Sequence, residues 1–193
     1  TVIGEPQDIK VAVIESIGIA RDLIDMRIHK GEHLRMGATD VVPFIPIKDM
    51  TMAECIELSK EVAKEVWEKY QIPIYLYEES ATASNRVSLP SIRKGEFEGM
   101  SEKMKLEEWG PDYGERAPHP TAGVTAIGGR MPLIAFNINL DTDNIEIAKN
   151  ISKAIRFSSG GYRYIQAGPA EIKEKGFVQV TMNIKDYKKN PIY

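Results

Sequence analysis

The sequence predicts an α+β fold, with a mixed, largely antiparallel sheet and helices packed on one of its faces. Two observations support this prediction. Strand-like and helical segments do not alternate regularly, as they would in a doubly wound parallel sheet, and neighbouring strand-like segments are placed as in hairpins. The chain has 193 residues, of which 42% are hydrophobic and 27% charged, which is typical of a folded globular protein and excludes a mainly disordered chain.

The first predicted element is a helix over residues 6–28 with one buried face. Pro6 stands in its first turn, Gly31 follows its end, and apolar residues recur at helical spacing at Ile9, Val13, Ile17, Ala20 and Ile24. Residues 41–47 are predicted to form a strand, because they are rich in β-branched residues. Two prolines lie within this strand, so we expect it at a sheet edge or a bulge.

The second helix is predicted to begin after Thr51. Thr51 and Glu54 have the spacing of a capping box, and the apolar pattern continues to about Tyr70. Residues 72–77 then have the composition of a strand. Residues 78–121 contain many Gly, Pro and charged residues, with room for short helices only. A loop of this length in a compact domain is usually functional, so we expect site residues in it.

The last part of the chain is predicted to contain four strands and a helix. Gly128 and Gly129 are interpreted as the turn of an antiparallel hairpin between strands at residues 124–127 and 132–140. Asp143 or Asn144 is then expected to cap the helix, which ends near Arg156, and the last two strands are predicted at residues 162–167 and 177–184.

Charge and cysteine content limit the partners and the compartment. Lys and Arg number 25 against 28 Asp and Glu, and the net charge of -3 provides no broad basic field for nucleic acid. Cys55 is the single cysteine and cannot form an intramolecular disulfide. The sequence has no signal-peptide pattern. It also has no apolar stretch as long as the roughly 18 residues that a membrane-spanning helix needs. We therefore expect a cytoplasmic protein that binds neither nucleic acid nor membranes.

The most distinctive local pattern involves two of the three histidines. His29-Lys30-Gly31-Glu32-His33 has the H-x-x-E-H order of an inverted zincin. Gly31 interrupts the pattern after the helical repeat has ended, so the sequence does not place both imidazoles on one helical face, and we expect no metal site. The simpler interpretation is two surface histidines that follow a helix C-terminus, where the helix dipole favours their protonated forms.

A longer series of motifs resembles a known family. The segment Gly31-Glu32-His33-Leu34-Arg35-Met36-Gly37-Ala38-Thr39-Asp40, followed by Val42-Pro43-Phe44-Ile45-Pro46, resembles the formiminotransferase domain of the glutamate formiminotransferases and the bifunctional formiminotransferase-cyclodeaminases. The resemblance covers essentially the whole chain, through Tyr75-Leu76-Tyr77, Ser88-Leu89-Pro90, Arg93, Gly95-Glu96, Trp109, Pro111-Asp112, Gly123 and residues 134–140.

The resemblance implies a domain organisation. The family's domain has two α/β subdomains that enclose a folate-binding tunnel, and we expect ferredoxin-like βαβ elements within it. By this comparison, residues 1–177 correspond to the N-terminal subdomain without its first strand and loop. Residues 178–193 then correspond to the opening strand of the C-terminal subdomain, the rest of which is missing.

The resemblance also implies a reaction. In this family the formimino group of N-formiminoglutamate moves to N5 of tetrahydrofolate and glutamate is released, in histidine degradation and one-carbon metabolism. Some relatives use N-formylglutamate instead. The implied partners are these small molecules, with tetrahydrofolate as co-substrate and no metal, and we expect a homodimer.

The family's catalytic histidine corresponds to His33, and its folate-contacting segment to residues 114–123. His33 suits the chemistry because the leaving glutamate nitrogen must receive a proton, and an imidazole can act as both base and acid near neutral pH. Asp40 is our own candidate to orient the imidazole or stabilise its charge. The expected folate-binding residues are Gly114, Glu115, Arg116, Ala117, Pro118, His119, Pro120, Thr121, Ala122 and Gly123.

Two alternative functions remain open from the sequence. The chain is either a folate-dependent transferase or a catalytically silent fragment that binds folate or another partner, since the missing ends allow intact motifs without activity. A zinc hydrolase acting through the H-x-x-E-H pattern is a third and weaker alternative.

Overall fold

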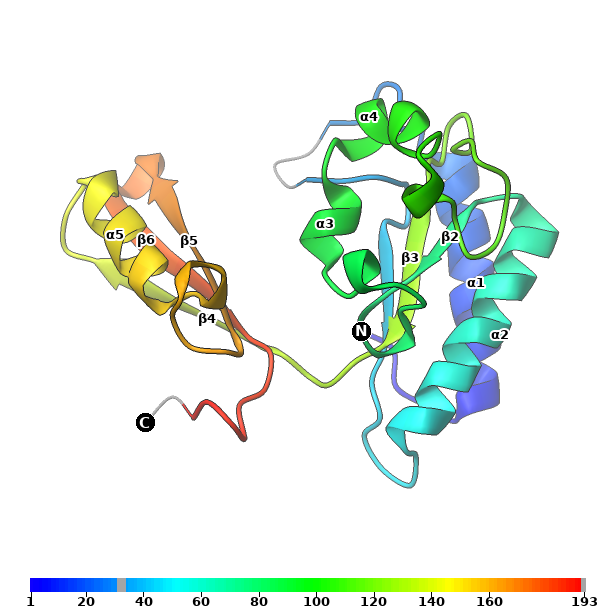
Figure 1. The fold of residues 1–193 in the computed structure, drawn as a ribbon, viewed down its shortest axis with the longest axis horizontal. Coiled ribbons are helices and arrows are strands. Elements are labelled where there is room, and N and C mark those ends of the chain that lie inside the picture. Colours follow the sequence, from blue (N-terminus) through cyan, green and yellow to red (C-terminus); the bar gives the residue numbers. More distant parts are fainter. Residues whose placement is uncertain (31–33, 192–193) are drawn as a thin grey trace. The chain divides into compact units, whose positions relative to one another are not determined.

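The computed structural model describes residues 1–30 and 34–191. The chain forms two compact units, unit 1 (residues 1–130) and unit 2 (residues 131–193), shown in Figure 1. Each unit has a three-stranded sheet, with the order β1-β3-β2 in unit 1 and β4-β6-β5 in unit 2. The subdomain boundary expected from the resemblance, between residues 177 and 178, lies inside unit 2.

The helices and strands divide between the two units in chain order. Unit 1 contains α1 (Pro6–Leu23), β1 (Val41–Phe44), α2 (Met52–Tyr70), β2 (Ile74–Leu76), η1 (Glu78–Ser80), η2 (Ser84–Arg86), α3 (Leu89–Arg93), α4 (Glu96–Lys103), η3 (Glu107–Trp109) and β3 (Thr125–Gly129). Unit 2 contains β4 (Ile134–Leu140), α5 (Ile145–Ile155), η4 (Phe157–Ser159), β5 (Ile165–Ile172), η5 (Lys173–Lys175) and β6 (Phe177–Ile184). Within the described residues, none of these helices is long and apolar enough to cross a membrane.

The fold class is α+β, but the prediction of one mixed, largely antiparallel sheet is wrong. In unit 1, β3 pairs in parallel with both β1 and β2. In unit 2, β6 pairs in antiparallel fashion with both β4 and β5. The sequence shows which segments are strands, but their pairing depends on contacts between distant parts of the chain.

The sheet of unit 1 has helices on both faces (Figure 1). Alternate residues of β2 point to opposite sides: Ile74 and Leu76 join the core formed with α1 and α2, whereas Tyr75 joins the core formed with α3 and α4. The prediction of helices on one face therefore holds for α1 and α2 but misses the second layer, which the short helices of the long 78–121 loop supply.

The start of α2 confirms the predicted capping box. The Thr51 hydroxyl accepts the Glu54 N–H (3.2 Å), and the Glu54 carboxylate accepts the Thr51 N–H (2.7 Å). By contrast, α1 ends at Leu23, before the predicted residue 28. Its end coincides with a tertiary contact, since the Met26 N–H donates to the Thr121 carbonyl (2.8 Å) and not to its own helix.

The predicted hairpin around Gly128 and Gly129 is wrong, because both glycines belong to β3. A Cβ on Gly128 would lie 2.2 Å from the Tyr77 carbonyl oxygen, so glycine permits a close approach inside the sheet at this position. The strand that follows, β4, pairs with β6 in unit 2.

Unit 2 is a small sheet with α5 on one face. Val178 and Val180 of the central strand β6 are buried against Ala148 of α5. Strand β6 matches the predicted strand 177–184, whereas β5 begins at Ile165 and not at residue 162. The C-terminal strand therefore has two partner strands in this chain, β4 and β5.

Candidate functional site

Two segments that are distant in sequence meet at the amino end of the parallel sheet. The 34–40 segment leads into β1, and the 114–123 segment leads towards β3. Since β1 and β3 are parallel neighbours, the residues that precede them lie at the same sheet edge. Backbone hydrogen bonds join the two segments, from the Val124 N–H to the Met36 carbonyl (3.1 Å) and from the Ala38 N–H to the Ala122 carbonyl (2.9 Å).

The expected catalytic residue, His33, lies outside the described residues. The described chain resumes at Leu34, the first residue of the 34–40 segment. The structure therefore brings the residues directly after His33 into contact with the expected folate-binding segment.

Within the 114–123 segment, residues 119–123 form a tight turn. The His119 N–H donates to the Gly123 carbonyl and the Gly123 N–H donates to the His119 carbonyl, both at 2.9 Å. The His119 ring also takes part, since its Nδ1 accepts the N–H groups of Thr121 (3.3 Å) and Ala122 (3.0 Å). Burial lowers the pKa of His119, and the nearby positive charge of Arg21 lowers it further. Because Nδ1 accepts two N–H groups, this turn fits the neutral ring with its proton on Nε2.

The first part of the same segment is more open. Gly114 has a φ of 118° and is packed beside Pro73 and Trp67. Residues 115–117 are exposed, and their backbone N–H groups donate no hydrogen bond among the described residues. The segment thus combines a rigid turn with a short stretch whose backbone donors are free for a ligand.

Asp40 organises the 34–40 segment. Its backbone has a left-handed φ of 62°, which Asp and Asn tolerate better than most residues. One carboxylate oxygen accepts the Met36 N–H (2.8 Å), and the other forms an ion pair with Arg93 at the end of α3. The Asp40 carbonyl also accepts the Ala126 N–H of β3 (2.9 Å). Asp40 therefore holds the backbone after His33 against both the sheet and α3.

Arg35 connects the other end of this segment to α4. Its guanidinium donates to both carboxylate oxygens of Glu98 (2.8 and 3.1 Å) and to Glu96 (3.1 Å). This contact lowers the pKa of Glu98 to about 2. The Arg35 carbonyl accepts the Phe97 N–H (2.9 Å), so backbone and side chain of Arg35 bind the same helix end.

A further ion pair lies before the 114–123 segment. Arg86 pairs with Asp112 at 2.6 Å, and both side chains are about nine-tenths buried. Asp112 also accepts the Leu76 N–H of β2 (2.8 Å), and the Arg86 guanidinium lies over the Tyr75 ring. Sequence reasoning assigned no role to Arg35, Arg86 or Arg93, because their partners are distant in the chain and no local spacing reveals them.

His29, the other histidine of the H-x-x-E-H pattern, has a local partner. Its Nδ1 lies 3.0 Å from the Asp25 carbonyl oxygen, in the turn that follows α1. Among residues 1–30 and 34–191, no group of three or more His, Cys, Asp or Glu side chains is placed to hold a metal ion.

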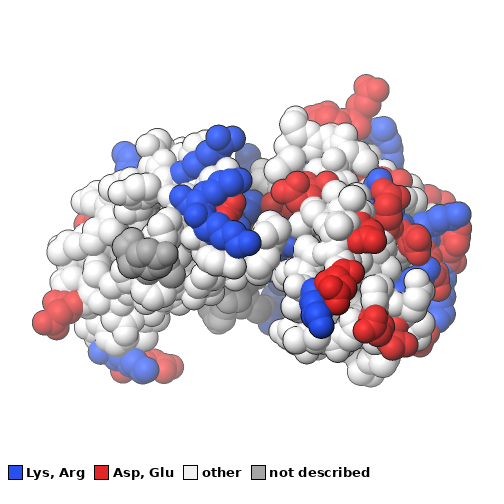
Figure 2. All heavy atoms as spheres, turned by 90° about the horizontal axis from the view of Figure 1, so that it is seen from below, with Lys and Arg blue, Asp and Glu red and all other residues white. Residues whose placement is uncertain are grey.

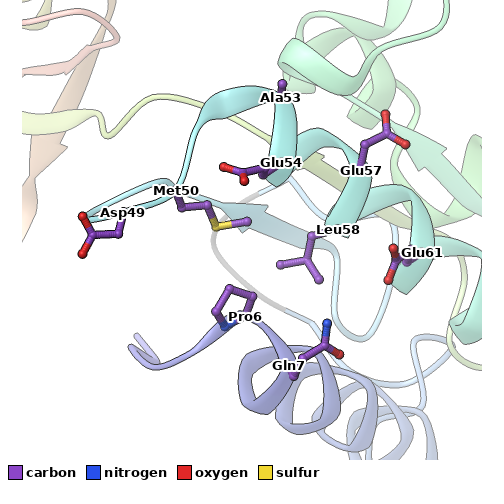
Figure 3. Close-up of a pocket in the computed structure, with 9 residues that line it drawn as sticks. All are labelled: Pro6, Gln7, Asp49, Met50, Ala53, Glu54, Glu57, Leu58 and Glu61. Carbon is purple, nitrogen blue, oxygen red and sulfur yellow. The ribbon is translucent and has the colours of Figure 1, made fainter.

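A pocket of about 430 Å³ lies away from these segments, between the first turns of α1 and α2 (Figure 3). Several acidic side chains surround it, and Figure 2 shows Asp and Glu side chains grouped on unit 1, the right-hand unit in that view. Glu54 is part of the capping box, Glu57 pairs with Lys60 and Glu61 pairs with Lys10. None of the expected site residues lines this pocket.

Comparison with known proteins identifies the class of domain that this fold and site belong to. The protein-family model described as 'Formiminotransferase domain, N-terminal subdomain' matches residues 1–130. These are the residues of unit 1. The chain therefore belongs to the formiminotransferase domain family.

Individual relatives agree with this family. The chain is 53% identical over its whole length to a glutamate formimidoyltransferase of Streptococcus pyogenes serotype M1, of which it covers 64%. It is 42% identical over 94% of its length to a glutamate formimidoyltransferase of Thermoplasma acidophilum, of which it covers 60%. It is 39% identical over 97% of its length to a formimidoyltransferase-cyclodeaminase of Sus scrofa, of which it covers 36%. The chain thus spans less than two thirds of these relatives.

Proposed function

We propose that the chain carries part of the site of a folate-dependent transferase. The reaction moves the formimino group of N-formiminoglutamate to N5 of tetrahydrofolate and releases glutamate, in histidine degradation and one-carbon metabolism. The observation that carries this proposal is the hydrogen-bonded contact between the 34–40 segment and the 114–123 segment. The resemblance assigns folate binding to the 114–123 segment and catalysis to His33, which directly precedes the 34–40 segment in the sequence.

In this proposal His33 moves the proton. The N5 nitrogen attacks the amidine carbon of N-formiminoglutamate, a new C–N bond forms, and a tetrahedral intermediate results. His33 accepts the proton from N5 and delivers it to the glutamate nitrogen, whose bond to carbon then breaks. Without that proton the leaving group would be an amide anion, so general acid catalysis contributes about 10²- to 10⁴-fold.

Asp40 supports this step through the backbone. Both of its carboxylate oxygens are engaged, by the Met36 N–H and by Arg93. We therefore assign Asp40 to holding the chain that follows His33, and through it the direction of the imidazole.

The 114–123 segment is assigned to tetrahydrofolate. The free backbone N–H groups of residues 115–117 suit the acceptor atoms of a pterin or of a glutamyl tail. The neutral His119 ring fixes the turn behind them. In this assignment Gly114 and Gly123 allow the backbone to bend at the two ends of the ligand contact.

Three further proposals concern the protein as a whole. We place the border of the N-terminal subdomain at residue 130, where unit 1 and the family match both end, in place of the residue 177 expected from the motifs. The protein acts as a homodimer. It works in the cytoplasm, where its substrates are small and soluble.

Two alternatives have less support. A catalytically silent fragment is disfavoured because relatives at 53% and 42% identity bear the name of the transferase. A zinc hydrolase is disfavoured for the same reason, since the name of these relatives is that of a transferase and not of a hydrolase.

The test is a transfer assay. N-formiminoglutamate and tetrahydrofolate are mixed with the protein, and the absorbance of 5,10-methenyltetrahydrofolate is followed after acid treatment. Product with N-formiminoglutamate supports the proposal, and a parallel reaction with N-formylglutamate identifies the preferred donor. Folate binding without product from either donor would favour the silent fragment.

A further inference from the structure

The joint between α3 and α4 contacts both ends of the 34–40 segment. Arg93 ends α3 and pairs with Asp40, whereas Glu96 and Glu98 in the first turn of α4 pair with Arg35. The 34–40 segment supplies the cation, Arg35, at one end and the anion, Asp40, at the other end. We call this arrangement the segment clamp, formed by Arg35 with Glu96 and Glu98, and by Asp40 with Arg93.

The Asp40–Arg93 end of the segment clamp is more shielded than the Arg35 end. The side chains of Arg35, Asp40 and Arg93 are 16%, 17% and 25% exposed, whereas those of Glu96 and Glu98 are 36% and 54% exposed. Arg35 binds Glu98 through two parallel N–H···O bonds, an arrangement that fixes direction as well as distance. Exposed ion pairs between flexible side chains do not fix a direction in this way, and they contribute little to the free energy of unfolding.

The clamp is also built at a cost to stability. Arg35 and Arg93 each have a buried Nε that finds no hydrogen-bond partner among the described residues. A buried donor without a partner is unfavourable by about 1–3 kcal/mol. Both arginines thus place their terminal nitrogens, and not Nε, on the carboxylates of the clamp.

The α3–α4 joint is itself held in place. The Lys103 ammonium group donates to the carbonyls of Ser91 (2.7 Å) and Ile92 (2.6 Å) in α3 and of Lys94 (3.2 Å) just after it. The same nitrogen lies 3.8 Å from the centre of the Trp109 ring. The Phe97 ring packs close to Gly123, where an added Cβ would meet it at 3.0 Å. The joint therefore contacts both segments of the candidate site.

We propose that Arg93 and Arg35 are positioning residues of the transfer reaction, which fix the 34–40 segment against the 114–123 segment through the segment clamp. This inference rests on the proposed function, and it adds two residues to which neither the family resemblance nor the relatives' names give a role. The clamp acts on the rate of the chemical step, because a displacement of about 1 Å in a reacting group lowers a rate by about 100-fold. Binding of substrates depends on it less.

The experiment introduces four sets of substitutions into the protein that is active in the transfer assay. It then compares kcat and KM of the four resulting proteins. Arg93→Gln and Arg35→Gln each break one end of the clamp. Asp40→Asn removes the charge that faces Arg93 but keeps an oxygen for the Met36 N–H and a residue that tolerates the left-handed backbone. The fourth protein combines Asp40→Asn with Arg93→Gln. The control is Lys10→Gln, which breaks the ion pairs that Lys10 of α1, itself 22% exposed, forms with Glu61 and Glu65 of α2.

The expected result is a fall in kcat of about 10- to 100-fold for each clamp variant, with KM for both substrates changed less than about threefold. The double variant should be no slower than the slower of its two single variants, because both act through one ion pair. Lys10→Gln should keep the unsubstituted kcat.

Two results would overturn the inference while leaving the proposed function intact. One is an active unsubstituted protein whose clamp variants keep kcat and lose only thermal stability, which is what a purely structural role predicts. The other is an additive loss in the double variant, which would show that Asp40 and Arg93 act separately. An unsubstituted protein that transfers no formimino group would overturn the proposed function and this inference together.

Discussion

Gly37 and Gly123 face each other in an antiparallel bridge at the amino end of the sheet of unit 1. A Cβ on Gly37 would lie 2.0 Å from the Val124 carbonyl oxygen, and a Cβ on Gly123 would lie 2.2 Å from the Met36 carbonyl oxygen. Gly123 also has a φ of 68°. The approach of the 34–40 segment to the 114–123 segment therefore requires glycine on both sides.

Substitution of Gly123 by alanine should destabilise unit 1 and separate the two segments. The added methyl group clashes with rigid backbone, and the left-handed conformation is unfavourable for alanine, so we expect a loss of at least about 2 kcal/mol in the free energy of unfolding. Chemical denaturation measures this loss, and the transfer assay should show a lower rate for the protein that remains folded.

Gly99 provides the matched control for this substitution. It lies inside α4, and a Cβ there would meet no atom within 4 Å. Gly99→Ala should therefore stabilise the protein by about 0.5–1 kcal/mol, through the better helix propensity of alanine. If both substitutions had the same effect, the close approach at Gly123 would not be what holds the segments together.

The features predicted well from the sequence are those set by neighbours in the chain. The start of α2 follows from Thr51 and Glu54, which are three residues apart and bond to each other directly. The bounds of β6 follow from an alternation of apolar and polar residues that begins after Gly176 and ends before the charged residues Lys185 and Asp186. The family motifs predict that His33 and residues 114–123 belong to one site; His33 lies outside the described residues, so this stays a prediction.

The features missed depend on distant partners. The parallel pairing of β3 was missed because Gly128-Gly129 is a turn signal in isolation, whereas in the fold Gly128 lets β3 approach Tyr77, the residue that follows β2. The clamp partners of Arg35 and Arg93 are 63 and 53 residues away. No periodicity or local spacing reports such contacts.

Replacement of His33 by asparagine should lower kcat by about 10²- to 10⁴-fold and leave the affinity for tetrahydrofolate nearly unchanged. The proton is needed in the transition state and not for binding. His29→Asn is the comparison, since the hydrogen bonds of the His29 ring are to Asp25 in its own turn, and we expect its kcat to stay within about twofold. Equal damage from both substitutions, together with inactivation by a chelator, would instead support the zinc alternative.

Hydrogen exchange should locate the folate contact. The amides of His119 and Gly123 are already hydrogen-bonded, whereas those of residues 115–117 donate to no described residue. A reduced-folate analogue should therefore slow exchange mainly at residues 115–117, with smaller changes in the turn behind them. Slower exchange confined to unit 2, or to the pocket between α1 and α2, would show that the 114–123 segment is not the binding segment.

The free energy of unfolding of unit 1 should decrease in mild acid because of the His119 turn. Burial lowers the pKa of His119 below its usual value near 6.5, so the unfolded chain binds the proton more readily than the folded chain does. The stability that His119 contributes is therefore complete above about pH 6.5 and is lost as the pH falls below that value. Protonation also removes the Nδ1 acceptor from the Thr121 and Ala122 N–H groups.

An NMR titration and a substitution test this dependence. The chain has three histidines, so their ring signals can be assigned by single substitutions, and the His119 signal should titrate below 6.5. His119→Asn keeps an oxygen acceptor near the position of Nδ1 but binds no proton, so its free energy of unfolding should fall less between pH 7 and pH 5 than that of the unsubstituted protein. A His119 pKa at or above 6.5, or the same pH dependence in both proteins, would mean that the neutral ring does not stabilise the turn.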